Sequence, residues 1–130
     1  MSARLFVAII GTWPVLAWSC GVCDEDKVAA TYDHEVISRA AAARYSVVFF
    51  TMDTSVEPRA FAQRVASVAP RVRGVVRGSV RTAIAPLAFS FVLDPAVQTP
   101  VSAVADLSRL LNAEPGLRIL RVVTASPNRS

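Results

Sequence analysis

The chain has 130 residues, of which 53% are hydrophobic and 18% are charged, and its formal net charge at pH 7 is +4. This length leaves room for one domain with a modest core, and the high apolar content excludes a largely disordered chain. The basic excess is mild, so the placement of the charges is more informative than their number.

The N-terminal residues 1–19 have the pattern of a signal sequence. Arg4 supplies a positive charge, and residues 5–17 form an apolar stretch shorter than the roughly 20 residues that a membrane-spanning helix needs. We therefore expect a periplasmic or secreted protein, and a buried N-terminal strand is the less favoured interpretation. Cleavage after residue 19 makes Cys20 the first residue of the mature chain. A lipoprotein acylated at Cys20 is a minority alternative, because Trp18 is bulky for the small-residue pattern of such a site.

A helix is expected over residues 27–43. The acidic residues Asp24, Glu25 and Asp26 precede it and suit the positive end of a helix dipole. Apolar residues then recur at spacings of three and four, which predicts one buried stripe. This stripe consists of Val28, Ala29, Tyr32, Val36 and Ile37.

Residues 45–124 alternate between strand and helix patterns. Residues 45–52 are expected to form a strand buried on both faces, followed by a helix over residues 57–69. Residues 71–77 and the segment from Ser79 onward are interpreted as the arms of a hairpin around Gly78, with a bulge or an edge position at Pro86. The remaining elements are a strand at 87–93, a helix at 101–112 and a strand at 117–124.

The order of these elements is βαββαβ, which predicts an α+β, ferredoxin-like sandwich. Its four-stranded antiparallel sheet would carry two helices on one face, and the N-terminal helix would be extra. The expected organisation is a signal peptide (1–19), a Cys-x-x-Cys motif with the N-terminal helix (20–44), the ferredoxin-like domain (45–124) and a tail (125–130).

About eighty residues, from 45 to 124, resemble a heavy-metal-associated domain, the ferredoxin-like module of copper chaperones and metal-ATPase N-termini. The resemblance is carried by Phe50-Thr51-Met52-Asp53 entering a helix, by Gly74-Val75-Val76, and by Phe89-Ser90-Phe91-Val92-Leu93-Asp94-Pro95 leading to Pro100-Val101-Ser102-Ala103-Val104. The two loop cysteines of that family are missing, because Thr54 and Glu57 stand at their positions. The resemblance therefore implies the fold and not the family's metal site.

The cysteines of this chain lie upstream, as Cys20-Gly21-Val22-Cys23. Two thiolates at this spacing can bind a soft metal, either Cu(I) in a linear or trigonal site or Zn(II) as half of a tetrahedral site. The same motif serves thiol-disulfide proteins, and export also permits a plain disulfide. We favour a metal-handling protein with Cys20 and Cys23 as ligands, ahead of a redox protein and of a binding module without cysteine chemistry.

A thioredoxin-like fold is the main structural alternative. It would use residues 5–19 as the strand before the cysteines and Ala85-Pro86 as the proline facing the sulfurs. It also requires a parallel central sheet and a helix over residues 117–124, where the pattern predicts a strand.

His34 is the single histidine, and it is expected on the exposed surface of a helix. On a continuous helix it would lie about 16 Å from Cys23, too far for both to bind one ion.

Motifs for nucleophilic, phosphate-binding or metalloprotease chemistry are absent, so an enzyme is not expected unless the cysteines act as a redox pair.

The charges are segregated along the chain. Acids concentrate between Asp24 and Glu35, and residues 59–81 carry six arginines with no acid. These regions are expected either to pair with each other or to dock an acidic partner. The arginines together with Phe89 and Phe91 also suit an RNA-recognition motif, but core packing and export favour no nucleic acid. The expected partners are a metal ion or another exported protein, with a membrane only if Cys20 is acylated.

The processing of the chain gives a first prediction. The mature protein should begin at or within a few residues of Cys20, because the apolar segment ends just before it. N-terminal sequencing and intact mass of protein from the native host test this, and mass also reveals acylation. A chain that begins at Met1 or Ser2 would contradict it.

Overall fold

A computed structural model of the chain describes residues 23–53, 55–113 and 116–124. Its helices are α1 (Asp24–Ala30), α2 (His34–Ala43), α3 (Pro58–Val68), the short 3-10 turn η1 (Ala69–Arg71) and α4 (Pro100–Leu111). Its strands are β1 (Ser46–Thr51), β2 (Arg81–Ile84), β3 (Leu87–Leu93) and β4 (Arg118–Thr124). The predicted signal segment, its cleavage site, Cys20 and the tail lie outside the described residues.

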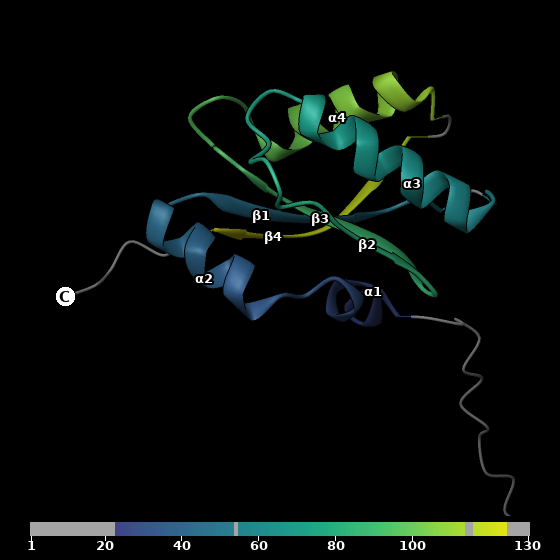
Figure 1. Cartoon of the computed structure of the whole chain (residues 1–130), viewed down its shortest axis with the longest axis horizontal. Coiled ribbons are helices and arrows are strands. Elements are labelled where there is room, and N and C mark those ends of the chain that lie inside the picture. Colours follow the sequence, from purple (N-terminus) through teal and green to yellow (C-terminus); the bar gives the residue numbers. More distant parts are fainter. Residues whose placement is uncertain (1–22, 54, 114–115, 125–130) are drawn as a thin grey trace, which may run out of the picture.

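The four strands form one antiparallel sheet in the order β2-β3-β1-β4. Helices α3 and α4 cover one face of this sheet (Figure 1). From β1 to β4 the chain therefore has the βαββαβ order of a ferredoxin-like fold, which confirms the predicted fold class. Among the described residues, none of the helices combines the length and hydropathy that crossing a membrane requires.

Two prolines fix where the covering helices begin. Pro58 and Pro100 occupy the first turns of α3 and α4, where a backbone N–H has no intrahelical acceptor to lose. The Glu57 carboxylate accepts the N–H groups of Arg59 and Ala60, and the Thr99 hydroxyl accepts that of Ser102. These caps explain why the two helices match their predicted positions closely.

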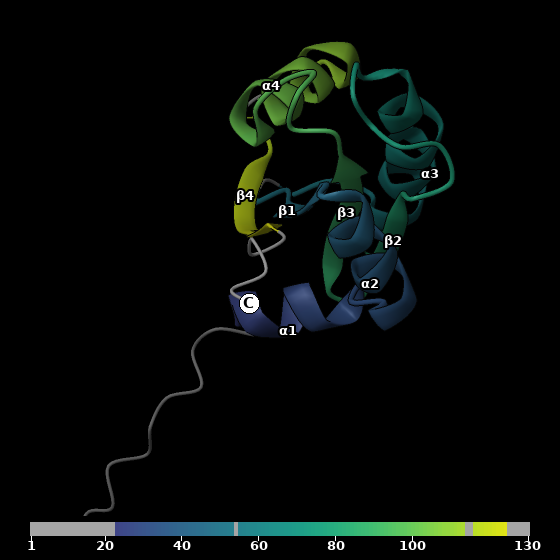
Figure 2. The ribbon, with the colours of Figure 1, turned by 90° about the vertical axis from the view of Figure 1, so that its left-hand side faces the viewer.

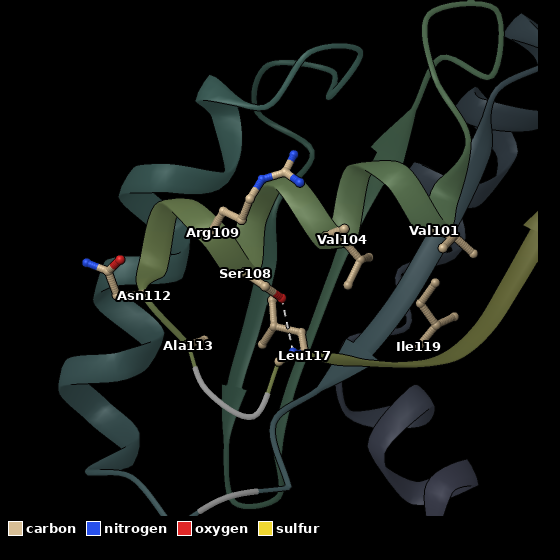
Figure 3. A pocket seen from close by; sticks show the side chains of 10 residues that line it. Val101, Val104, Ser108, Arg109, Asn112, Ala113, Leu117 and Ile119 are labelled. Carbon is tan, nitrogen blue, oxygen red and sulfur yellow. Dashed lines mark hydrogen bonds between the residues drawn. The ribbon is translucent and has the colours of Figure 1, made fainter.

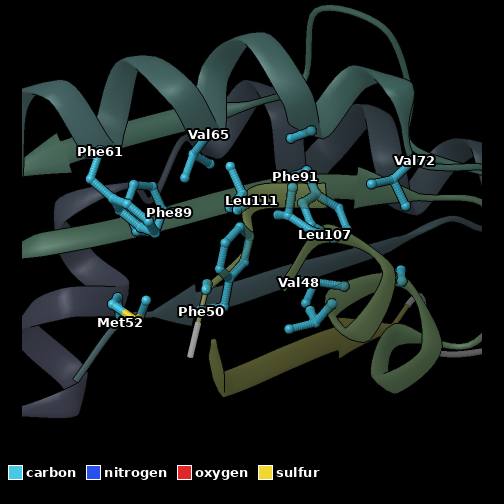
Figure 4. Close-up of a cluster of buried hydrophobic side chains, with 14 of the residues drawn as sticks. Val48, Phe50, Met52, Phe61, Val65, Val72, Phe89, Phe91, Leu107 and Leu111 are labelled. Carbon is cyan, nitrogen blue, oxygen red and sulfur yellow. The ribbon is translucent and has the colours of Figure 1, made fainter. Parts of the chain in front are cut away.

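An aromatic cluster fills the core between the sheet and the helices α3 and α4 (Figure 4). The ring of Phe50 lies 5.3 Å from those of Phe89 and Phe91, measured between centroids, and Phe61 from α3 packs on Phe89 at 5.8 Å. All four rings are buried. Core packing thus accounts for the aromatic residues that also suited an RNA-recognition motif.

The opposite face of the sheet is covered by α1 and α2, so the molecule has three layers (Figure 2). Val47, Phe49 and Val92 point to this face and pack with Val28 of α1 and Ala40 of α2. Helices α1 and α2 therefore form a layer over this face of the sheet, and this layer is called the lid below.

The prediction of one continuous helix over residues 27–43 was wrong. The chain breaks between α1 and α2 at residues 31–33, because Asp33 takes the N-cap position and its carboxylate accepts the N–H groups of Glu35 and Val36. The stripe is interrupted at the same place: Val28 is buried, whereas Tyr32 is 54% exposed. The break divides the lid into two short helices.

The predicted hairpin around Gly78 was also misplaced. The hairpin consists of β2 and β3, and the cis-bonded Ala85-Pro86 forms its turn. Residues 71–80 are irregular apart from η1 and one isolated bridge between Val75 and Leu93. Gly74 and Gly78 both have positive φ angles, 89° and 81°, and these turns prevent the segment from extending as a strand.

The packing of the lid on the sheet predicts how much stability one core substitution removes. Phe49 is 1% exposed and faces α1 and α2, so Phe49→Ala should lower the free energy of unfolding by about 3–5 kcal/mol. Tyr32→Ala is the control, because this exposed side chain should change stability by less than about 0.5 kcal/mol. Urea unfolding measures both. Equal, small effects of the two substitutions would contradict the packing of the lid.

Candidate functional site

Cys23 is the member of the Cys-x-x-Cys motif that the structure describes. It is exposed and occupies the N-cap position of α1, where its carbonyl oxygen accepts the N–H groups of Asp26 at 3.0 Å and Lys27 at 3.2 Å. Cys20 lies outside the described residues. Because α1 has only 7 residues, the position of Cys23 depends on what holds this helix to the sheet.

Arg118 at the start of β4 holds α1 in place. Its guanidinium donates to the carboxylate of Asp24 at 3.0 and 3.1 Å and to that of Asp53 at 2.5 and 3.1 Å. Asp24 follows Cys23 directly, and Asp53 belongs to the loop between β1 and α3. This Arg118 bridge therefore brings the start of α1 to the β1–α3 loop.

The bridge also sets the charge state of its members. Hydrogen bonding to Arg118 lowers the pKa of Asp24 and of Asp53 below the ordinary value of 3.8, and the two carboxylates raise the pKa of Arg118. All three groups are thus charged at neutral pH. Glu25 adds a second tie between α1 and β4, since its carboxylate lies 3.4 Å from Arg121.

Two side chains of the β1–α3 loop stabilise the fold. Met52 is buried in the core beneath α3, and the carboxylate of Glu57 caps that helix. Thr54 lies outside the described residues. Glu57 thus stabilises the start of α3 through its carboxylate.

His34 is exposed at the first position of α2, as expected. The predicted separation of His34 from Cys23 along one continuous helix was wrong, however, because the helix is broken at residues 31–33. In the described ranges 23–53, 55–113 and 116–124, no group of three or more histidine, cysteine or acidic side chains could hold a metal ion.

The segregated charges meet in a different way from the one expected. Two of the five acids between Asp24 and Glu35 pair with β4, Asp24 with Arg118 and Glu25 with Arg121. One pair does join the two regions: Arg81 lies 3.5 Å from Asp33. The role of Arg118 and Arg121 was missed, although they are the two charged residues in an otherwise apolar final strand.

A shallow groove runs between α4 and β4 (Figure 3). Val101 and Val104 form part of its apolar wall, and Val101 is 71% exposed. Two of its polar side chains are engaged within the fold: the Ser108 hydroxyl accepts the N–H of Leu117 at 3.1 Å, and Arg109 forms an ion pair within α4. The rest of the lining is mostly apolar.

Comparisons of the chain with family models, curated proteins and solved structures gave no match.

The Arg118 bridge predicts a pH-dependent stability. Because the pKa values of Asp24 and Asp53 are lowered by folding, their contribution is complete above pH 3.8 and is lost as the pH falls through the folded values. Arg118→Gln should lower the urea midpoint modestly at pH 7, and the difference from wild type should shrink below pH 3.8. It should also shrink in high salt, since the pairs are exposed.

Arg109→Gln is the matched control, because its ion pair lies within α4 and links no other element. Hydrogen exchange should show faster opening of α1 in the Arg118 variant and unchanged exchange of α1 in the control. A difference from wild type that persists undiminished at low pH would show that the bridge does not act through ionised carboxylates.

Proposed function

We propose that this chain is a small exported metal-handling protein in which Cys20 and Cys23 bind a soft metal ion as a thiolate pair. Cu(I) and Zn(II) are the candidates, because both accept thiolate ligands. A pair of thiolates suits Cu(I) in a low-coordinate site, or supplies half of a tetrahedral zinc site. Zinc would then need further ligands from outside the described residues or from a partner.

The observation that supports this proposal best is the Arg118 bridge. It ties the residue after Cys23 to Asp53, in the loop where heavy-metal-associated domains carry their cysteines. A cysteine pair just before α1 would then lie near this loop, although it belongs to another part of the chain. The resemblance of residues 45–124 to that family implied a ferredoxin-like fold, and the chain has that fold.

The chemistry of the described residues fits this role. Cys23 is exposed, so a partner protein could approach its sulfur and exchange a metal. Both thiols must lose their protons to act as ligands, and binding should therefore release protons. The neighbouring carboxylates of Asp24 and Asp53 are already engaged with Arg118, which leaves the soft sulfurs as the preferred ligands.

A thiol-disulfide protein that uses the same two cysteines is the competing function. Its thioredoxin-like form is contradicted by the fold, because the sheet is antiparallel and residues 118–124 form β4 and not a helix. Pro86, which that alternative placed opposite the sulfurs, lies in the turn between β2 and β3. A redox role on the ferredoxin-like fold is an outcome of the experiment below.

Titration of the reduced protein with Cu(I) and Zn(II), against a competing chelator, tests the proposal. Wild type should take metal from the chelator and release protons, and its bound thiols should resist alkylation. Cys20→Ser and Cys23→Ser should each abolish binding, since one thiolate leaves the ion without its second sulfur. Arg109→Gln is the control and should leave the affinity unchanged, because its ion pair lies within α4.

Three outcomes would reject the metal function. The first is no binding tighter than that of the chelator, and the second is binding that survives when both cysteines are serine. The third is a redox signature without metal, in which Cys23→Ser traps mixed disulfides through Cys20 and the wild type has a measurable reduction potential. This third result would establish the competing function.

A further inference from the structure

A second candidate site lies on the lid side of the sheet, between α2 and the loop of residues 76–79. Its volume is about 240 Å³, which is below the roughly 300–1,000 Å³ of pockets that hold drug-sized ligands. Val36 and Ala40 from α2 and Val92 from β3 give it an apolar lining. The pocket is lined wholly by described residues.

Three arginines also line this pocket: Arg39 from α2, Arg77 from the loop and Arg81 from β2. Arg39 pairs with Glu35 and Arg81 with Asp33, so the rim carries more positive than negative charge. Arg77 is exposed, and its guanidinium forms no ion pair within the described part of the chain. The rim can therefore attract an anion.

The existing ion pairs do not close this rim. The side chains of Arg39 and Glu35 are 78% and 70% exposed, and those of Arg81 and Asp33 are 40% and 38% exposed. Exposed pairs of this kind contribute little, so the guanidinium of Arg39 can turn to a ligand at small cost. Arg81 is held more firmly, because its guanidinium also donates to the carbonyls of Gly78 at 2.9 Å and Val80 at 3.1 Å. The pocket combines an apolar interior with a rim of cations.

The wall formed by residues 76–79 is fixed against the sheet. The N–H of Val76 donates to the carbonyl of Val92 at 2.9 Å, and the N–H of Val92 donates to the Ser79 hydroxyl at 3.0 Å. That hydroxyl donates in turn to the carbonyl of Val76 at 2.6 Å. The wall is thus preformed, and a ligand need not order it on binding.

We propose that this pocket binds a carboxylate attached to a short apolar group. The apolar group would lie against α2 and Val92, and the carboxylate would accept hydrogen bonds from the arginine rim, with Arg77 as the principal donor. Two sources present this chemistry: a free small carboxylic acid, and an apolar residue at the C-terminus of a peptide. The site is independent of Cys20 and Cys23.

Titration of the purified protein with 4-methylpentanoate, followed through the amide NMR signals of Val76, Gly78 and Ser79, tests the proposal. Saturable shifts with a Kd on the order of 1 mM are expected for a ligand of so few atoms. The neutral 4-methylpentanamide should bind about tenfold more weakly or not at all, since it lacks the charged acceptor. A peptide ending in leucine, compared with its C-terminal amide, distinguishes the two sources by its relative affinity.

Arg77→Gln should weaken binding of the carboxylate about tenfold. Arg73→Gln is the matched control, because Arg73 is an exposed arginine of the same segment that does not line the pocket. The variant with both cysteines replaced by serine should bind the carboxylate like wild type, so failure of the metal function leaves this test intact. Shifts that do not saturate, equal binding of the amide, or equal effects at Arg73 and Arg77 would overturn the proposal.

Discussion

Strand β1 is buried along its whole length, and this constrains the rest of the molecule. Val48 and Phe50 pack with α3 and α4, while Val47 and Phe49 face the other side of the sheet. A sheet that is apolar on both faces must be covered on both. The N-terminal helices are therefore required by the sequence of β1, and they carry Cys23 to the edge of the sheet as a consequence.

The elements that could be predicted from the sequence are those bounded by clear local signals. Pro58 and Pro100 marked the starts of α3 and α4, and the run of residues 87–93 ended at an Asp-Pro pair. The break at residues 31–33 could not be predicted from periodicity, because apolar spacing continues across it. It depends on Asp33 capping α2, a local signal that competes with helix continuation. The hairpin was misplaced because Gly78 gave a stronger turn signal than Ala85-Pro86.

The candidate site could be predicted only in part. The Cys-x-x-Cys motif is local and was found, whereas Arg118 and Asp24 are 94 residues apart. Arg118 and Arg121 would point to opposite faces of a regular strand, since their spacing is odd. Their partners in the sheet are Thr51 and Phe49, which share a face, because the pairing register shifts between Phe49 and Phe50. This irregularity turns both arginines toward α1, and no sequence pattern predicted it.

Both candidate sites lie where the lid meets the ferredoxin-like unit beneath it. The cysteine pair precedes α1, and the arginine-rimmed pocket borders α2, with the break at residues 31–33 between them. Helix α1 is short and buries Val28 alone, so its docking depends on exposed ion pairs that contribute little individually. If the cysteine pair binds a metal only while α1 is packed on the sheet, metal binding would stabilise that packing by mass action. The metal would then strengthen the contact of α1 with β4.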